Sequence, residues 1–113
     1  MNTKSVFVPL NKEAFRDFSK GKTFEVRRAE RGWNRNQIYT GRGITLSCGY
    51  SGARLSGVIG KVIFGSIRKI FKEVLFKKIE PLAKNCNEAK KINTKLLGIA
   101  QEYVAFEIIL NGN

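Results

Sequence analysis

Residues 21–28 (GKTFEVRR) place two kinds of cation, a carboxylate and a hydroxyl within a few positions of one another. Side chains on a strand alternate between its faces, so Thr23, Glu25 and Arg27 would share one face. A carboxylate two residues from a guanidinium can orient it toward a planar anion such as phosphate. Lys22 would face the other way on an ideal strand, but a turn at the start of the strand would redirect it into the same cleft.

The same run also fits an ordinary amphipathic strand. Phe24 and Val26 would then face a core, while Glu25 and Arg27 form a surface ion pair worth about 0 to 1 kcal/mol. A P-loop is excluded, because its first glycine would fall at Arg16 and the order of strand and helix is reversed.

Composition favours one small domain spanning residues 1–113, because 113 residues with 42% hydrophobic content suit a single core. Lysine and arginine number 21 against 9 acidic residues, which gives a net charge of +12. Such a surface attracts polyanions, so nucleic acid is the expected partner class. The alternative is a generically basic protein that binds nucleic acid without specificity.

The chain has no histidine, which removes the commonest general base and a common metal ligand. Cys48 and Cys86 are far apart in sequence and form no zinc or CxxC motif, so we expect reduced thiols, a cytoplasmic protein, and neither a metal nor a cofactor. No apolar run reaches the roughly 18 residues that a membrane span needs.

The elements around the run are predicted from pattern. Residues 5–10 indicate a strand, with Pro9 ending it or confining it to a sheet edge. Asn11 is a helix N-cap candidate, residues 12–20 form a short amphipathic helix, and Gly21 closes that helix.

Residues 29–43 have no periodicity and indicate a basic loop. Trp33 and Tyr39 stand among arginines there, a mixture suited to base stacking and phosphate contact. Alternatively, the two aromatic side chains anchor the loop to the sheet.

Further strands are predicted at 44–48, 58–64 and 103–110, with Gly57 and Gly60 as bulge or curvature sites. Residues 87–100 indicate a helix that places Ala89, Ile92, Leu96 and Ile99 on one side and lysines on the other. Residues 66–78 are ambiguous, and a strand leading into a loop or helix is favoured. This order predicts an α+β fold built on a curled sheet.

The run resembles the G-x-K-x-x-E-x-R signature of ASCH domains, which belong to the PUA-like superfamily of small β-barrels. Residues 57–62 resemble that family's glycine-containing strand, and residues 103–108 resemble its closing strand. One position departs from the pattern: Lys20 stands where the family has glycine, and the glycine is the adjacent Gly21.

The resemblance implies a small curled PUA-like β-barrel flanked by short helices, with a cleft in which RNA or a nucleotide meets Lys22, Glu25 and Arg27. Thr23 occupies a position that is commonly threonine. Adding the basic loop, the expected binding residues are Lys22, Glu25, Arg27, Arg28, Arg31, Trp33, Arg35, Tyr39 and Arg42.

Two alternatives remain open. Some small members of the family look like amide hydrolases of acylated cytidine that use a lysine, a threonine and a glutamate. Here Glu25 fills the threonine position and removes the expected hydroxyl nucleophile, which Thr23 could replace if the turn reorients Lys22. The catalytic candidates are therefore Lys22, Thr23 and Glu25. Such an enzyme would also need a downstream carboxylate, either Glu73 or Glu80. The second alternative is a basic module that binds an acidic protein partner, or a ribonuclease.

Overall fold

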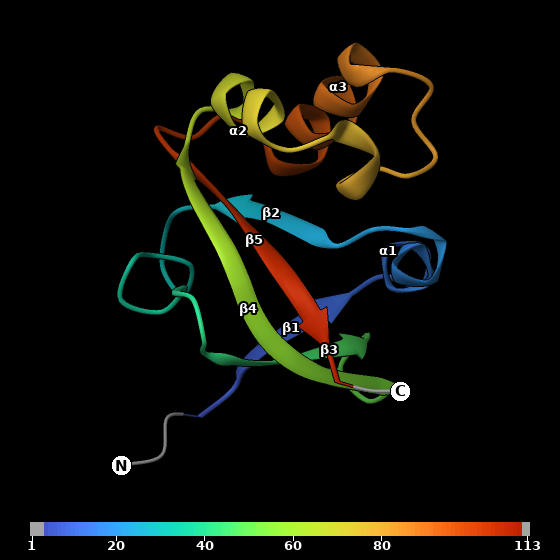
Figure 1. The fold of residues 1–113 in the computed structure, drawn as a ribbon, viewed down its shortest axis with the longest axis vertical. Helices are drawn as coiled ribbons and strands as arrows, with labels where there is room; N and C mark the ends of the chain where they lie inside the picture. The colour runs from blue at the N-terminus through green and yellow to red at the C-terminus, as the bar shows by residue number, and fades with distance from the viewer. Residues whose placement is uncertain (1–3, 112–113) are drawn as a thin grey trace.

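Five strands form one curled sheet in the order β1-β3-β4-β5-β2 (Figure 1). The computed structural model describes residues 4–111. Strand β1 pairs with β3 in parallel, and every other pair is antiparallel. The strands are β1 (Val6–Leu10), β2 (Phe24–Arg28), β3 (Gly43–Cys48), β4 (Arg54–Gly65) and β5 (Tyr103–Leu110).

Three short helices flank the sheet: α1 (Lys12–Asp17), α2 (Ile67–Glu73) and α3 (Cys86–Leu97). Two 3-10 turns, η1 (Phe18–Lys20) and η2 (Phe76–Lys78), follow α1 and α2. Helices α2 and α3 lie together over one side of the sheet, and α1 lies apart from them beside β1 (Figure 1). The architecture is therefore α+β, a five-stranded half-barrel with short flanking helices, as predicted.

The long strand β4 bends the sheet. The β4–β5 register shifts between Ile59 and Val62, which places an irregularity at the predicted Gly60. At Gly57 a Cβ atom would lie 2.3 Å from the Ile109 carbonyl oxygen, so glycine there permits close approach of β5. Curvature at these positions lets the sheet enclose one face.

The two faces of the sheet bury separate apolar clusters. The concave cluster includes Val8, Leu46 and Phe106, with Ile38 contributed by the basic loop. The convex cluster joins the sheet to α2 and α3 and contains the following buried residues: Phe24, Val26, Ile63, Ile70, Phe71, Val74, Ile79, Ala83, Ala89, Tyr103 and Ala105.

The predicted entry into β2 is confirmed. Asn11 caps α1 by accepting a 2.7 Å hydrogen bond from the Ala14 amide. Gly21 ends η1 with φ at 106°, a left-handed conformation that favours glycine. Pro9 lies in β1, which is an edge strand.

Three expectations about the elements were wrong. Residues 67–73 form a helix, not a strand, because Ser66 caps it and Ile70 and Phe71 pack on the sheet. Strand β4 begins at Arg54, earlier than predicted, since its first residues pair with β3.

The third concerns the orientation of α3. This helix buries Ala89 and Asn93, while Ile92, Leu96 and Ile99 of the expected apolar side are exposed. The helix is rotated so that Ala89 and Leu97 pack against the convex cluster, and it ends at Leu97, before Ile99.

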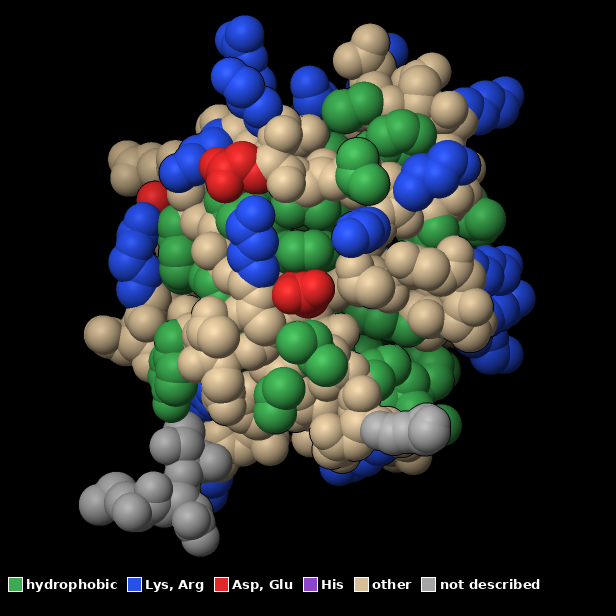
Figure 2. Space-filling model, in the orientation of Figure 1, with side chains coloured by type: hydrophobic (Ala, Val, Ile, Leu, Met, Phe, Trp, Pro, Cys, Tyr) green, Lys and Arg blue, Asp and Glu red, His purple; other side chains and the backbone are tan. Residues whose placement is uncertain are grey.

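Lysine and arginine side chains are spread over the face seen in Figure 2 and do not form one patch. Within residues 4–111, none of the helices has the length and apolar character required to cross a membrane.

Candidate functional site

The seam between the two edge strands holds a cleft. Because the sheet is curled, β1 and β2 come near each other, and Arg27 Nη2 donates a 3.4 Å hydrogen bond to the Pro9 carbonyl. The cleft has a volume of about 320 Å³. Strands β1 and β2, α1, α3 and the segment after η2 supply its lining, which is Pro9, Leu10, Asn11, Ala14, Asp17, Lys22, Glu25, Val26, Arg27, Glu80, Asn93, Leu96 and Leu97.

Alternation along β2 places the central pair as predicted. Phe24 and Val26 enter the convex apolar cluster, so Glu25 and Arg27 lie on the opposite face of the strand. Glu25 Oε2 lies 2.8 Å from Arg27 Nη2. The side chain of Glu25 is only 10% exposed, so this is not the surface ion pair of the alternative interpretation.

Lys22 reaches the same place through the turn at Gly21. Its backbone amide donates to the Asp17 carbonyl at 3.1 Å, and β2 begins two residues later. The side chain is 4% exposed, with Nζ 3.2 Å from Glu25 Oε1 and 2.7 Å from the Ile79 carbonyl oxygen. The predicted redirection of Lys22 toward the cleft is thus confirmed. Gly21, although it stands one position later than the glycine of the family signature, forms the turn that redirects Lys22.

The Glu25 carboxylate is therefore held between two cations. Burial by itself would raise the pKa of this carboxyl group, but the charges and hydrogen bonds of Lys22 and Arg27 outweigh burial and hold the pKa below its ordinary value. Glu25 is consequently ionised at neutral pH, and both of its oxygens are occupied by the neighbouring cations.

Arg27 is the more accessible cation, with its side chain 22% exposed. Its guanidinium carbon lies 4.9 Å from the centre of the Trp33 ring, and Trp33 in turn stacks on Phe106 at 5.9 Å between ring centres. Within residues 4–111 its hydrogen bonds, to Glu25 and Pro9, both use Nη2. Nε and Nη1 remain as donors for an external group.

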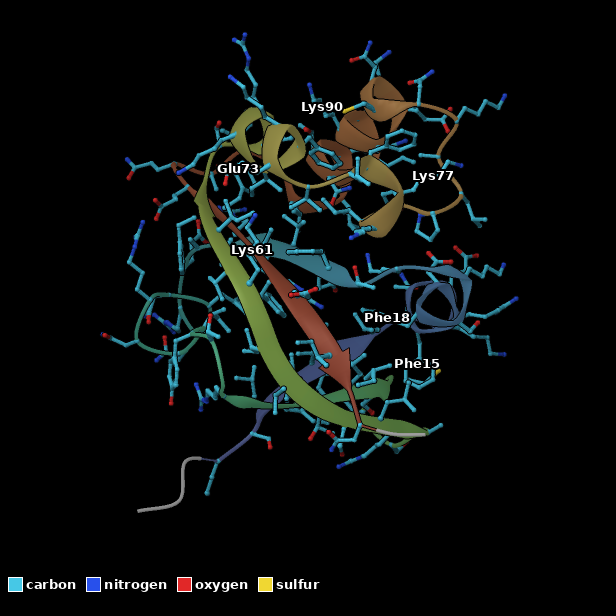
Figure 3. The ribbon with its side chains drawn as sticks, viewed as in Figure 1. Phe15, Phe18, Lys61, Glu73, Lys77 and Lys90 are labelled. Carbon is cyan, nitrogen blue, oxygen red and sulfur yellow. The ribbon has the colours of Figure 1, made fainter. Side chains whose placement is uncertain are left out.

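Two further polar side chains line the cleft, Glu80 and Asn93. Glu80 Oε1 accepts a 3.4 Å hydrogen bond from Asn93 Nδ2. Burial raises the pKa of the Glu80 carboxyl group, and the charges of Asp17 and Glu25 raise it further against the opposing charge of Lys22. Glu80 was one of two carboxylates considered from the sequence; the other, Glu73, is exposed at the end of α2 (Figure 3).

Asp17 and Asn93 were not identified as site residues. In the sequence, Asp17 looks like an ordinary acidic residue of a short helix. Asn93 is a polar residue of α3 that was not among the residues expected on the inward side of that helix. No local signal marks either of them, since both reach the cleft through the packing of α1 and α3 around the seam.

The expected loop residues divide into two groups. Arg28 and Arg31 line a second hollow of about 280 Å³ that adjoins the cleft and also contains Arg27 and Trp33. Arg35 instead makes a two-pronged contact with Glu102 at 2.8 Å, away from the cleft.

Tyr39 and Arg42 also lie outside the cleft lining. The Arg42 guanidinium carbon is 5.8 Å from the Tyr39 ring centre, and Arg42 donates hydrogen bonds to the carbonyl oxygens of Lys4 and Gln37.

Thr23 is separate from the cleft lining, and its buried Oγ1 has no hydrogen-bond partner within residues 4–111. In the part of the chain that the structure describes, no serine, threonine, tyrosine or cysteine lines the cleft. Among residues 4–111 no cluster of acidic, cysteine or histidine side chains could hold a metal ion.

No protein-family model matches the chain, and no curated protein matches it in sequence. Among solved structures it is similar to the hypothetical protein PH0355, with 19% identity over 93% of this chain and 97% of that one and a TM-score of 0.73. It is also similar to ASCH from Zymomonas mobilis, with 13% identity over 91% of this chain and 65% of that one and a TM-score of 0.61. A point mutant of that protein gives 14% identity, coverage of 94% and 69%, and a TM-score of 0.64.

Together the curled five-stranded sheet and its short helices give this protein a small α+β architecture. Its fold is ASCH-like, as the sequence resemblance implied. The chain spans about two thirds of the length of the Zymomonas mobilis protein.

Proposed function

We propose that this protein binds RNA, or a nucleotide unit of it, in the cleft between β1 and β2, with Arg27 as the principal contact to phosphate. The observation that carries this proposal is the fixed guanidinium: Glu25 and Trp33 hold Arg27 at the mouth of the cleft while Nε and Nη1 remain available. A guanidinium edge with two donors matches the geometry of phosphate oxygens.

Preorganisation favours binding at this position. An unrestrained arginine loses side-chain entropy when it binds, about 0.5 to 1.5 kcal/mol per immobilised side chain. Arg27 is already ordered by a 2.8 Å ion pair and by contact with Trp33. Lys22 has a supporting role, because its buried ammonium fixes the Glu25 carboxylate that orients Arg27.

Binding is favoured over amide hydrolysis by what the cleft lacks. A hydrolase using a hydroxyl nucleophile needs that group in the cleft, and the lining contains none. Lys22 Nζ is held in contacts with Glu25 Oε1 and the Ile79 carbonyl oxygen, so it is engaged within the protein and not directed at a substrate.

A polyanionic partner is favoured by the net charge of +12. The cations outside the cleft supply long-range attraction and non-specific contact, whereas the cleft would provide specific recognition. The adjoining hollow adds Arg28, which is paired with Glu30, and Arg31 as further cations beside the cleft.

The test is fluorescence anisotropy with short single-stranded RNA, matched DNA and a polyglutamate peptide, at salt concentrations from about 50 to 200 mM. Arg27→Ala is compared with Arg54→Ala. Arg54 is a matched control, since it also lies over an aromatic ring, Phe7 at 5.2 Å, but on the exposed start of β4.

We expect Arg27→Ala to weaken RNA binding at least about tenfold, equivalent to about 1.4 kcal/mol, and Arg54→Ala to change it less than about twofold. Equal small losses from both variants, or equal affinity for RNA and polyglutamate, would contradict recognition in the cleft and leave only a polycationic surface.

A further inference from the structure

The cleft continues into hollows on both sides, and together they form one groove. At one end it shares Arg27 and Leu97 with the hollow that contains Arg28 and Arg31. At the other end it shares Asp17, Glu80 and Leu96 with a hollow of about 500 Å³ between α1 and α3. We call this continuous feature the seam groove.

The two ends of the seam groove carry opposite charge. Arg27, Arg28 and Arg31 line the first end together with Glu30, which pairs with Arg28 at 2.8 Å, and the other end contains the cation Lys95. The other end holds a concentration of carboxylates that is unexpected in so basic a chain: four of its 9 acidic residues line the cleft or the hollow beyond it, namely Glu13, Asp17, Glu25 and Glu80. Glu25 lies between its two cations, whereas Glu80 forms no ion pair within residues 4–111 and, among cations, is affected only by the more distant charge of Lys22.

A buried amide points to a ligand at this acidic end. Asn93 is only 4% exposed and lines the cleft beside Glu80. Within residues 4–111 both of its hydrogen bonds, to Ala89 at 3.0 Å and to Glu80 at 3.4 Å, use Nδ2. Its carbonyl oxygen is therefore an acceptor still without a donor, next to a carboxylate that can also accept.

Apolar side chains separate the two ends. Leu96, which is 72% exposed, and Leu97 lie on the α3 side of the cleft, and Ala14 lies on the α1 side. A flat ring between these walls would meet apolar surface on its faces and hydrogen-bond acceptors at its edge.

We propose, on the basis of the proposed function, that the seam groove binds a nucleotide in one direction, with its phosphate at the arginine end and its base against Glu80 and Asn93. The groove would select bases that carry an exocyclic amino group over uracil. An ionised carboxylate and an amide carbonyl oxygen only accept hydrogen bonds, which an exocyclic amino group can donate. Uracil presents a single N3–H donor between two carbonyl oxygens, so it can satisfy one of these acceptors but would set a carbonyl oxygen against the other.

The experiment measures anisotropy with short oligocytidylate, oligoadenylate and oligouridylate at about pH 8, where carboxyl groups are ionised. Wild type, Glu80→Gln and Glu73→Gln are compared, together with Arg27→Ala. Glu73→Gln also removes one negative charge, but from an exposed side chain at the end of α2 and not from the cleft (Figure 3). It therefore controls for the general electrostatic effect of removing one carboxylate.

We expect the wild type to prefer oligocytidylate or oligoadenylate over oligouridylate by about tenfold. In Glu80→Gln that preference should fall below about threefold, because the amide can also donate to a uracil oxygen; Glu73→Gln should keep it. Asn93→Asp is a second variant that retains an acceptor at the same site, and it should keep the preference as well.

Failure of this inference and failure of the proposed function give different results. If all three oligonucleotides bind equally while Arg27→Ala still weakens binding at least about tenfold, the base assignment is overturned and RNA binding in the cleft stands. If Arg27→Ala has no effect, both are overturned. A third result would also overturn the inference. In it, the protein shows no preference among the oligonucleotides but binds a lysine-rich peptide, and Glu80→Gln weakens that binding. The carboxylates would then serve a cationic partner.

Discussion

Replacement of Glu25 by glutamine removes the negative charge that lies between Lys22 and Arg27. Breaking a buried ion pair by removing one partner typically costs about 3 to 5 kcal/mol, because the remaining charge is left uncompensated. Lys22 is 5% exposed and keeps its 2.7 Å hydrogen bond to Ile79, while Arg27 can move toward solvent. We therefore expect a loss near the lower bound, about 3 kcal/mol in the free energy of unfolding.

Urea unfolding followed by circular dichroism and by the fluorescence of Trp33 measures this loss. For a domain of this size, about 3 kcal/mol corresponds to a decrease in Tm of roughly 12 °C. The exposed Glu73→Gln variant is the matched control and should stay within about 0.5 kcal/mol of wild type.

A double variant separates charge compensation from simple loss of contacts. Lys22→Met combined with Glu25→Gln removes one buried charge with the other, so the pair should cost less than the sum of the single changes. Additive losses, or a loss below about 1 kcal/mol for Glu25→Gln alone, would refute the conclusion that the carboxylate is buried between its two cations.

Further predictions concern the turn, the sheet and pH. Gly21→Ala should destabilise the protein by about 1 to 2 kcal/mol, since φ is 106° there, and should weaken RNA binding by displacing Lys22; an unchanged Tm would contradict this. Gly57→Ala should cost at least as much, measured by the same unfolding, because its Cβ would meet the backbone of β5. Because the pKa of Glu25 is lowered in the folded protein, the stability that this group contributes is present above its ordinary pKa of 4.5 and is lost as pH falls through the folded pKa. Glu25→Gln should therefore reduce the loss of unfolding free energy at acid pH. Glu80 has the opposite effect on stability: because its pKa is raised in the folded protein, the free energy of unfolding falls as pH rises from 4.5 through the folded pKa. A Glu80→Gln variant that kept this decline would show that Glu80 does not cause it.

The sequence predicted those parts of the site that depend on local geometry. Alternation along a strand was enough to pair Glu25 with Arg27, and a glycine after a short helix was enough to anticipate the turn that redirects Lys22. The strands at 44–48 and 103–110 were likewise confirmed, because runs of β-branched and aromatic residues favour extended structure.

Contacts between distant segments were not predictable in this way. Asn93 and Glu80 enter the cleft because α3 packs through its small residue Ala89, leaving Leu96 exposed beside the seam. A pattern of large apolar residues identifies the helix but selects the wrong side of it when the inward side is formed by Ala89 and Leu97. The same difficulty affected residues 67–73, where a helical stripe and a buried strand are alike in sequence.

The central claim, that RNA is recognised at Arg27, is tested most directly by the side-chain Nε–Hε resonances of the arginines in a ¹⁵N-labelled sample titrated with the preferred short RNA. The Arg27 resonance should shift and saturate along the same curve as the anisotropy, while the Arg54 resonance stays in place. Shifts of exposed arginines such as Arg54, with Arg27 unchanged at saturation, would contradict recognition in the cleft.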